Sequence, residues 1–387
     1  MINVFEEKAV CCGCGACVQS CPKKAITMVK DKKYFLYPKI DEEKCIKCNI
    51  CRTQCPFQQE NKKLLETNVK TKVYAVKHKD DIIRNTSTSG GIFTALSDFV
   101  LNQNGVIYGA AFVEDLKVEH IRATTAEERN RFRGSKYVQS EINNIFQMIK
   151  KDLLNKKNVL FSGTPCQVAG LKYYLKNLSD SEHLILVDVI CHGVPSPKIF
   201  EEHIQKLSEI KQVKHYSFRD KKEGWHKHVE EVSFIDGITD NKTKLSQSYK
   251  KYFQQDLMNR ESCYNCPFAN MKRVSDVTIG DYWGIEKIFP KFDDNKGISL
   301  CLIHTEKGQI IFNRIKEDIE YIESNTTDCL QPQLEYSTKM PLNYDLFWND
   351  YFKFGYNLIL KKYTSVRLSR KIKNKIGRLL RKLRLTK

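Results

Sequence analysis

Two copies of one cysteine pattern near the start of the chain constrain what this region can fold into. Each copy reads C-x2-C-x2-C-x3-C-P, in CCGCGACVQSCP and CIKCNICRTQCP, and the second follows the first by 34 residues. With this spacing, three cysteines on one tight loop hold three irons of a 4Fe-4S cube, and the fourth binds the other cube. We therefore predict two clusters, one held by Cys11, Cys14, Cys17 and Cys55 and the other by Cys45, Cys48, Cys51 and Cys21.

The alternative for these eight cysteines is a pair of zinc sites, but zinc usually takes two separated pairs of ligands. Cys12 is off the pattern, and we interpret it as a spectator rather than a ligand. The segment resembles a bacterial two-cluster ferredoxin, which implies an α+β ferredoxin-like domain over residues 1–57. Such a domain carries electrons and has no substrate pocket, so the rest of the chain must decide the function.

The length of 387 residues exceeds one typical domain, and 41% hydrophobic residues can form a sizeable core. No apolar run is long enough to span a bilayer. The start, MINVFEEKAV, has acidic residues where a secretory signal would be basic and then apolar. We expect a cytoplasmic protein, in which fifteen cysteines favour metal ligands over disulfides.

After a polar linker at residues 58–71, strand and helix patterns alternate through a body that we place at 72–345. Such alternation predicts an α/β fold with a mainly parallel or mixed sheet. Ser87, Thr88 and Ser89 precede an amphipathic helical pattern, so we expect their side chains to cap that helix. Strands are predicted at 72–78, 105–113, 158–163 and 183–190, and helices within 87–105 and at 141–154 and 167–178.

Four further cysteines form a candidate third centre. Cys263 and Cys266 are two residues apart, while Cys166 and Cys191 each follow a predicted strand. A strand–helix–strand unit brings both strand ends to one edge of a parallel sheet, so Cys166 and Cys191 can face each other there. We predict a third 4Fe-4S cluster on these four, with structural zinc or no metal as the alternatives. Cys301 lies in a strand pattern that we expect in the core, and Cys329 has no recognisable partner.

Several turns are suited to a phosphorylated ligand. TSTSGG, with Ser89, Gly90 and Gly91, and SGTPCQ, with Gly163 and Thr164, each open a helix, where free amides favour anions. RFRGSKYVQS sets Arg131, Arg133 and Lys136 around a glycine, and GDYWG predicts a turn near a planar ligand. A dinucleotide-binding G-x-G-x-x-G in its usual context is not found. Because clusters pass single electrons and most metabolites take pairs, the chemistry favours a flavin as converter.

Together, STSGGIFTAL, GSKYVQS, SGTPCQVAGLK, ICHGVPSP, CYNCPFA and IGDYWG resemble the beta subunit of coenzyme F420-reducing hydrogenase and related dehydrogenases. The resemblance covers roughly residues 72–310. It implies FAD near Ser89, Gly90, Gly91 and Lys136, and a 4Fe-4S cluster at the four cysteines. We count Gly163, Thr164 and His192 as further candidate cofactor contacts, and His192 and Trp225 as candidates for substrate contact. No catalytic residue is assigned.

The expected function is therefore an FAD- and iron–sulfur-dependent oxidoreductase that exchanges hydride with an organic acceptor. The resemblance leaves the acceptor open between coenzyme F420 and an unidentified metabolite, because the family includes bacterial members linked to surface-polysaccharide genes. The alternative is a non-enzymatic electron-transfer subunit or adaptor that docks to a partner reductase. Its partner would be a redox protein, whereas the enzyme would need a small-molecule hydride acceptor.

The end of the chain is strongly basic. Residues 366–387 hold ten Lys or Arg and no acidic residue. The rest of the chain has 64 − 10 = 54 basic and 46 acidic residues, so its net charge is +8, and the last residues account for ten of the total net charge of +18. Ile376, Leu379, Leu380 and Leu383 fall on one face of a helical pattern. We predict a C-terminal basic helical tail over 346–387, suited to an anionic membrane surface at the inner face of the membrane. Packing on the body and RNA contact are the alternatives, and nucleic acid is the least favoured partner.

Overall fold

The computed structural model describes residues 4–58 and 70–364. The N-terminal unit, residues 4–58, is a two-stranded antiparallel hairpin with short helices beside it. Both α-helices begin after a left-handed residue, Gly15 (φ 74°) and Asn49 (φ 58°), which turns the cysteine loops sharply. The elements are η1 (Lys8–Val10), α1 (Ala16–Gln19), β1 (Ile26–Lys30), β2 (Leu36–Ile40) and α2 (Ile50–Thr53).

The body is built on an eight-stranded sheet in the order β13-β3-β12-β11-β7-β6-β4-β5. The four adjacent strands β4, β6, β7 and β11 pair in parallel, and every other pairing is antiparallel. Of the two predicted alternatives, the sheet is therefore mixed rather than mainly parallel. Its strands are β3 (Lys72–His78), β4 (Val106–Phe112), β5 (Val118–Ala123), β6 (Val159–Gly163), β7 (Leu184–Val189), β11 (Val277–Asp281), β12 (Ser299–Ile303) and β13 (Ile319–Ser324).

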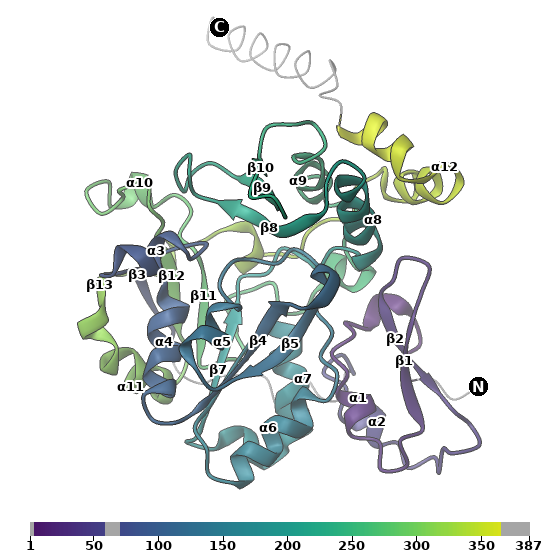
Figure 1. Cartoon of the computed structure of the whole chain (residues 1–387). Coiled ribbons are helices and arrows are strands. Elements are labelled where there is room, and N and C mark those ends of the chain that lie inside the picture. The colour runs from purple at the N-terminus through teal and green to yellow at the C-terminus, as the bar shows by residue number, and fades with distance from the viewer. Residues whose placement is uncertain (1–3, 59–69, 365–387) are drawn as a thin grey trace, which may run out of the picture.

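Helices cover both faces of this sheet (Figure 1). On one face α4 (Ile92–Leu101) and α11 (Glu306–Arg314) pack, and on the other α6 (Ile145–Leu154) and α7 (Pro165–Leu175). Side chains of a strand alternate between the faces: in β6, Val159 and Phe161 join the α6–α7 core, whereas Leu160 joins the α4–α11 core. Three short helices, α3 (Asp81–Asn85), α5 (Ala126–Asn130) and α10 (Ile285–Ile288), complete the large-sheet layer.

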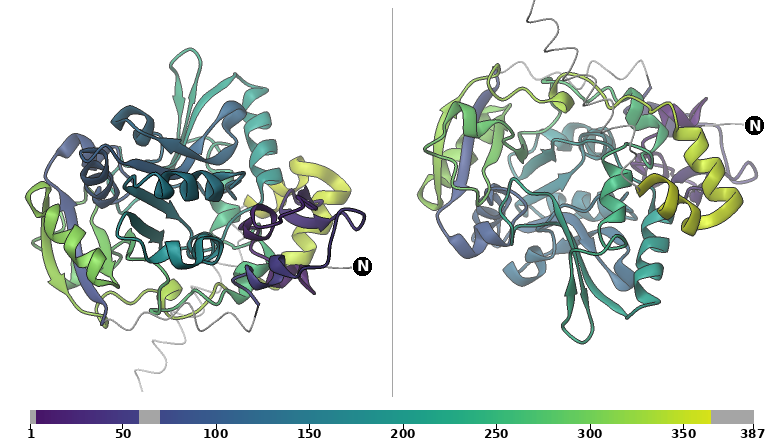
Figure 2. Two further views of the ribbon diagram at one scale, coloured as in Figure 1. Left: turned by 90° about the horizontal axis from the view of Figure 1, so that it is seen from below. Right: turned by 90° about the horizontal axis from the view of Figure 1, so that it is seen from above.

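A smaller three-stranded sheet stands beside the large one, as Figures 1 and 2 show. It consists of β8 (Val213–Asp220), β9 (Val229–Phe234) and β10 (Thr239–Asp240), with α8 (Pro197–Ser208), α9 (Ser248–Phe253) and α12 (Tyr344–Thr364) around it. Buried aromatic side chains such as Tyr216, Phe218 and Tyr249 fill this layer. Phe347, Tyr356 and Ile359 of α12 belong to the same core, so residues up to 364 pack with the body although the sequence suggested a boundary at 345.

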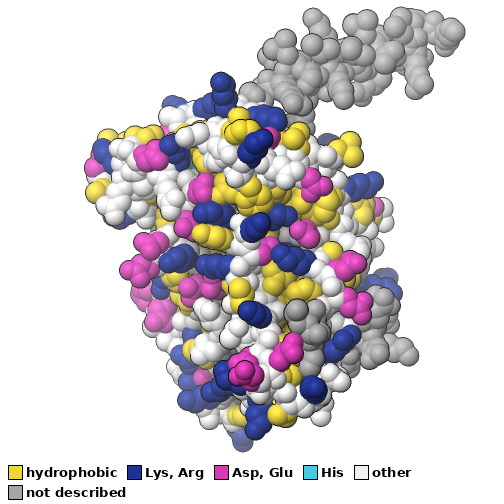
Figure 3. Space-filling model, turned by 90° about the vertical axis from the view of Figure 1, so that its right-hand side faces the viewer, with side chains coloured by type: hydrophobic (Ala, Val, Ile, Leu, Met, Phe, Trp, Pro, Cys, Tyr) yellow, Lys and Arg dark blue, Asp and Glu magenta, His cyan; other side chains and the backbone are white. Residues whose placement is uncertain are grey.

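The face formed by the N-terminal unit and α12 carries Lys and Arg side chains interspersed with Asp and Glu, with hydrophobic side chains between them (Figure 3). The basic stretch 366–387 of the predicted tail lies outside the described residues, as does most of the predicted linker. None of the helices that the structure describes combines the length and apolar composition needed to cross a membrane.

Candidate redox centres and cofactor cavity

Two small cavities in the N-terminal unit are each lined by four of the repeat cysteines. Cys11, Cys14, Cys17 and Cys55 line the first, and Cys21, Cys45, Cys48 and Cys51 line the second. The last cysteine of each copy therefore lies at the cavity formed by the other copy, which is the arrangement expected of two 4Fe-4S cubes. Positive-φ glycines, Gly13 and Gly15, shape the first loop.

The other four predicted ligands line one further cavity, in the body. Cys166 lies in the first turn of α7 after β6, and Cys191 lies two residues after β7. Because β6 and β7 pair in parallel, their ends bring these two cysteines together. Cys263 and Cys266, on and beside the short helix η5 (Glu261–Asn265), complete the cavity, and the Val194 amide donates to Cys263 Sγ at 3.4 Å.

The spacing of these thiols is wider than zinc requires. A tetrahedral zinc with 2.3 Å bonds would hold its sulfurs about 3.8 Å apart. Among the described residues, only His226, Glu286 and Asp293 bring three ligand atoms within 4.8 Å of one another, and no cysteine set does. The cysteine cavities thus suit a larger group such as a cube. Burial raises the pKa of Cys191 to about 12 and of Cys266 to about 11, so binding a metal must release protons.

A buried ion pair holds the Cys263–Cys266 loop against the end of β7. Arg273 Nη2 donates to Asp188 Oδ1 (3.0 Å) and to the Val189 carbonyl (3.1 Å), while Nη1 donates to the Phe268 carbonyl (2.9 Å). The two charged side chains are 1% and 0% exposed. Arg273 therefore connects the loop that carries Cys266 to the strand that leads to Cys191.

We expect Arg273→Met to lower the free energy of unfolding by about 3–5 kcal/mol, because it leaves the Asp188 carboxylate buried without its cation. The midpoint of anaerobic urea unfolding measures this. Lys296→Met is the matched control: its ion pair with Asp81 is exposed, so a change below about 1 kcal/mol is expected. Equal midpoints for the two variants would contradict the assigned role of Arg273.

Cys12, interpreted from sequence as a spectator, lies on the walls of both the first repeat cavity and the body cavity. Hydrogen bonding with Cys14 and Cys166 raises the pKa of its thiol well above the usual value. Beside it, Cys14 packs directly on α7: a Cβ built on Gly170 would come within 2.8 Å of Cys14 Sγ. The N-terminal unit is therefore seated on the helix whose first turn carries Cys166.

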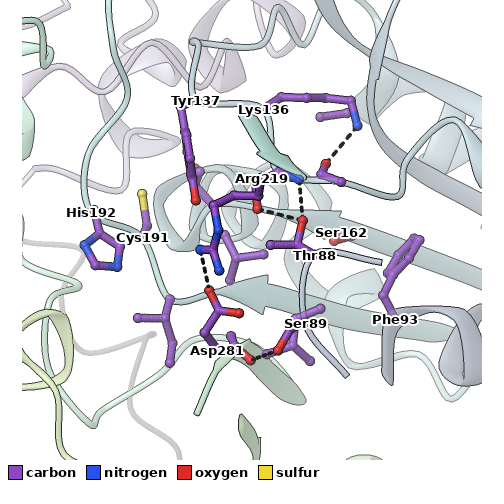
Figure 4. A pocket seen from close by; sticks show the side chains of 18 of the residues that line it. Thr88, Ser89, Phe93, Lys136, Tyr137, Ser162, Cys191, His192, Arg219 and Asp281 are labelled. Atoms are coloured by element: carbon purple, nitrogen blue, oxygen red, sulfur yellow. Dashed lines mark hydrogen bonds and ion pairs between the residues drawn. The ribbon is translucent and has the colours of Figure 1, made fainter. Parts of the chain in front are cut away.

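A cavity of about 320 Å³ adjoins the body cysteines. Its wall includes Cys191, His192, Gly193 and Val194, and the same four residues line the cysteine cavity. In Figure 4, Cys191 and His192 lie on one side, and Thr88, Ser89 and Phe93 on the other. The ends of the parallel strands β6, β7 and β11 contribute Gly163, Val189 and Asp281, so the cavity occupies the sheet edge where α/β proteins bind ligands.

The turn before α4 differs from its prediction. The N-cap is Gly91 (φ 91°), and no side chain in the described part of the chain caps the helix. Thr88 Oγ1 instead accepts from the Ser135 amide (2.8 Å), and Ser89 Oγ donates to the Ile298 carbonyl (2.7 Å). Gly90 lies outside the cavity, packed so closely on β3 and β12 that a Cβ would be 2.2 Å from the Val76 carbonyl oxygen. The first amides of α4 thus have no side-chain acceptor beside a cavity that Ser89 and Gly91 line.

Lys136 lies in the cavity wall but binds its own loop. Its Nζ donates to the carbonyls of Phe132, Arg133 and Gly134 at 3.1–3.3 Å. Burial, followed by the charge of Arg131, lowers its pKa to about 7. Thr164 also lines the cavity, where its amide donates to Gln167 Oε1 (2.9 Å), so this second helix start is already capped.

The opposite wall contains polar and aromatic groups, of which the sequence motifs indicated Trp225 and the GDYWG turn but not Arg219. Arg219 Nη1 pairs with Asp281 Oδ2 at 3.0 Å, and its guanidinium lies 5.1 Å from the Trp283 ring centroid (Figure 4 shows the ion pair). Trp225, named from sequence as a substrate contact, is 1% exposed and stacks beneath Trp283 at 4.8 Å. Trp283, which lines the cavity, is the ring that a ligand can reach. Both tryptophans lie in motifs that the sequence suggested as ligand contacts, but the motifs alone do not show which ring faces the cavity.

His120 contributes a buried nitrogen without a partner. Its Nε2 bonds the Ser162 carbonyl at 3.1 Å, whereas Nδ1 has no hydrogen-bond partner among the described residues. Burial lowers the pKa of His120 to about 4, so the ring is neutral near pH 7. With Nε2 donating, Nδ1 is an acceptor in a side chain that lines the cavity. Such an orphaned polar atom fits a ligand that brings its own hydrogen-bond donor.

Comparison with known families agrees with this layout. A model described as a 4Fe-4S dicluster domain matches residues 10–59. Models of the coenzyme F420 hydrogenase/dehydrogenase beta subunit match residues 73–147 with their N-terminal part and 156–328 with their C-terminal part. Together, the two beta-subunit matches extend over more than half of the chain.

Individual relatives are distant. The coenzyme F420-dependent sulfite reductase of Methanocaldococcus jannaschii is 26% identical over 326 residues, which cover 81% of this chain but 47% of the relative. This chain thus spans about half the length of that protein. A subunit of the F(420)H(2) dehydrogenase of Methanosarcina mazei is 23% identical, over 81% of this chain and 84% of the relative.

Among solved structures, a chain from the F420-reducing [NiFe] hydrogenase complex of Methanosarcina barkeri matches with a TM-score of 0.45 and 17% identity, over 67% of this chain and 83% of that one. The family matches confirm the resemblance inferred from the sequence motifs. This chain belongs to the family of coenzyme F420 hydrogenase/dehydrogenase beta subunits, as an iron–sulfur member with a 4Fe-4S dicluster domain in front of the beta-subunit body.

Proposed function

We propose that the protein is an iron–sulfur flavoprotein oxidoreductase with three 4Fe-4S clusters and one FAD. The observation that carries the proposal is the wall from Cys191 to Val194, which separates the body cysteine cavity from the 320 Å³ cavity and lines both. A redox centre on the four cysteines would therefore lie next to any ligand in the larger cavity. Bound there, a flavin would supply the conversion between single electrons and a hydride.

The cavity has features that fit a flavin nucleotide. Its volume is within the range of small-molecule sites, about 300–1,000 Å³. The start of α4 offers amides without a side-chain cap, and the positive end of the helix dipole favours phosphate there. Arg133 lies at the same rim and donates to Thr94 Oγ1 at 3.0 Å. His120, which is neutral near pH 7, adds an imidazole to the same wall.

The acceptor would bind on the side of Trp283, whose ring can stack on a planar molecule. Both relatives are named for coenzyme F420, so we propose F420 as the first acceptor to test, ahead of an unidentified metabolite. Asp281 and Arg219 place one negative and one positive group beside this ring. They would orient an acceptor that carries both hydrogen-bond donors and an anionic group.

A redox partner protein would exchange electrons at the second repeat cavity. Cys48, which lines it, is exposed, whereas Cys14 and Cys17 of the first cavity are buried. The second cluster is therefore the one nearer to solvent. The Methanosarcina mazei relative is named as one subunit of a dehydrogenase, which fits a protein that works with partners.

Anaerobic reconstitution with iron, sulfide and FAD tests the proposal. We expect about twelve irons and one flavin per chain, as three cubes and one FAD require, and bleaching of the flavin absorbance when reduced F420 is added. Twelve irons with flavin but no response to F420 would reject that acceptor only. Eight irons without flavin would reject the enzyme in favour of a non-enzymatic electron-transfer subunit.

A further inference from the structure

One fully buried arginine connects the N-terminal unit to the body. Arg260 is 0% exposed, and its side chain leaves the body to reach the first cysteine loop. Its Nε donates to the Cys11 carbonyl (2.7 Å), and its Nη2 donates to the Leu36 carbonyl (2.9 Å) and to Cys11 Sγ (3.6 Å). No carboxylate is paired with this guanidinium among the described residues.

Aromatic and amide groups complete its surroundings. The guanidinium carbon lies 4.0 Å from the centroid of Tyr37, close enough for a cation–π contact. Gln139 Oε1 accepts from Nη1 at 3.0 Å, and the amide of Gln139 in turn donates to the Cys12 carbonyl at 3.4 Å. Each of these contacts of the side chain is thus neutral, apart from the Cys11 sulfur.

Arg260 also belongs to the other centre, because it lines the body cysteine cavity and its backbone binds the loops there. Its amide donates to the Val194 carbonyl (3.0 Å), and its carbonyl accepts from the Cys263 amide (2.9 Å). Val194 is part of the wall between the body cysteines and the large cavity. One residue therefore contacts a ligand loop of the first cluster through its side chain and a ligand loop of the body centre through its backbone.

We propose that Arg260 is a positioning residue that raises the reduction potential of the first cluster, held by Cys11, Cys14, Cys17 and Cys55, relative to the second. Reduction adds one negative charge to a cube, and a buried cation with no counter-carboxylate stabilises that charge more strongly than a solvated one would. Hydrogen bonds to ligand sulfur act in the same direction.

Among the described residues, no charged side chain is seen to donate to a sulfur of the second set of cysteines, as Arg260 does to Cys11. The basic side chains that line the cavity of this second set are Lys23 and Lys47, and both are exposed. Water screens such charges, so they stabilise a reduced cube less than Arg260 does. The wall of the second cavity, as far as the structure describes it, therefore holds no buried cation.

The two clusters would therefore be reduced in order, the first cluster, which faces the body, before the second. This inference requires only that the first cluster is present, and the dicluster domain match supports that cluster without the rest of the proposed function. It rests on the proposed function for the onward transfer to the body centre. A protein that bound neither a third cluster nor FAD would end the proposed function and still allow the role of Arg260 to be measured.

The test is a potentiometric titration of the full chain followed by electron paramagnetic resonance, in wild type and Arg260→Gln. We expect one of the two N-terminal cluster potentials to fall, with at least a tenfold change in its oxidised-to-reduced equilibrium, about 59 mV for one electron. The second cluster is the internal reference and should not move. Arg260→Lys, which keeps the charge, should restore most of the potential.

Two further variants keep the test decisive if Arg260→Gln folds poorly. Gln139→Met leaves the charge but releases Nη1, so it should shift the same potential by less. Lys33→Gln removes the ion pair with Glu261 (3.0 Å), another contact between the N-terminal unit and the body that touches no cysteine, and should leave both potentials unchanged. The proposal is overturned if Arg260→Gln and Gln139→Met retain the wild-type potentials, or if Lys33→Gln shifts them equally.

Discussion

Replacing Cys266 by alanine is expected to lower the iron content from about twelve to about eight per chain and to leave one FAD bound. Cys266 lines the body cysteine cavity but not the larger one, so its loss should remove the third cluster selectively. Electron exchange between the dicluster domain and the flavin should then stop. Iron and flavin analysis measures the first effect, and rapid mixing with a reductant of the clusters, followed at the flavin absorbance, measures the second.

The matched control is Cys329→Ala. Cys329 is buried, at 1% exposure, whereas Cys266 is half-buried; Cys329 belongs to the core beside Tyr282 and lines none of the cysteine cavities described above. Its replacement should leave twelve irons and normal flavin reduction. If the Cys266 variant keeps the wild-type iron content, or loses iron only in the same proportion as the control, the third cluster is wrongly assigned.

Placing an aromatic ring inside the large cavity is expected to abolish FAD binding. Ser162, on β6, lies in the cavity wall (Figure 4), and Ser162→Phe would fill space that the flavin needs. We expect the flavin content of the reconstituted protein to fall from one to near zero while twelve irons remain, because the cysteines lie beyond the shared wall. Absorbance at the flavin band after acid release measures the bound cofactor.

Ser208→Phe provides the comparison, because it makes the same substitution at an exposed position at the end of α8. It should bind one FAD and reduce it at the wild-type rate. Full flavin occupancy in the Ser162 variant would show that FAD binds elsewhere. Loss of both iron and flavin would indicate misfolding, and Ala110→Leu, a smaller intrusion into the same cavity, would then take its place with the same expected loss of flavin.

The grouping of the cysteines could be predicted from sequence because its determinants are local. The repeat spacing assigns Cys21 and Cys55 across the two copies, and the parallel pairing of β6 with β7 follows from the intervening helix α7. The structure brings together each set of four that was predicted. The place of Cys12 on two cavity walls could not be predicted, because it depends on how the N-terminal unit meets the body, which no local pattern encodes.

Other features depended on contacts distant in sequence. Strand β3 comes first in the body, yet it lies between β12 and β13, both more than two hundred residues later. This insertion produces two of the four antiparallel pairings of the sheet. The hydroxyls of Thr88 and Ser89 resemble helix caps in the sequence, but Ser135 and Ile298 engage them instead. Arg260 was missed for the same reason, since all its side-chain partners lie in other segments.

The close contact between Cys14 and Gly170 has a kinetic consequence. Cys166 and Gly170 are four residues apart on α7, about 6 Å along its axis. In the proposed electron path, the distance between the first cluster and the body centre would therefore be set by a single helix. Electron tunnelling over that distance would need no closing motion, so the proposed function predicts that solvent viscosity has little influence on this step.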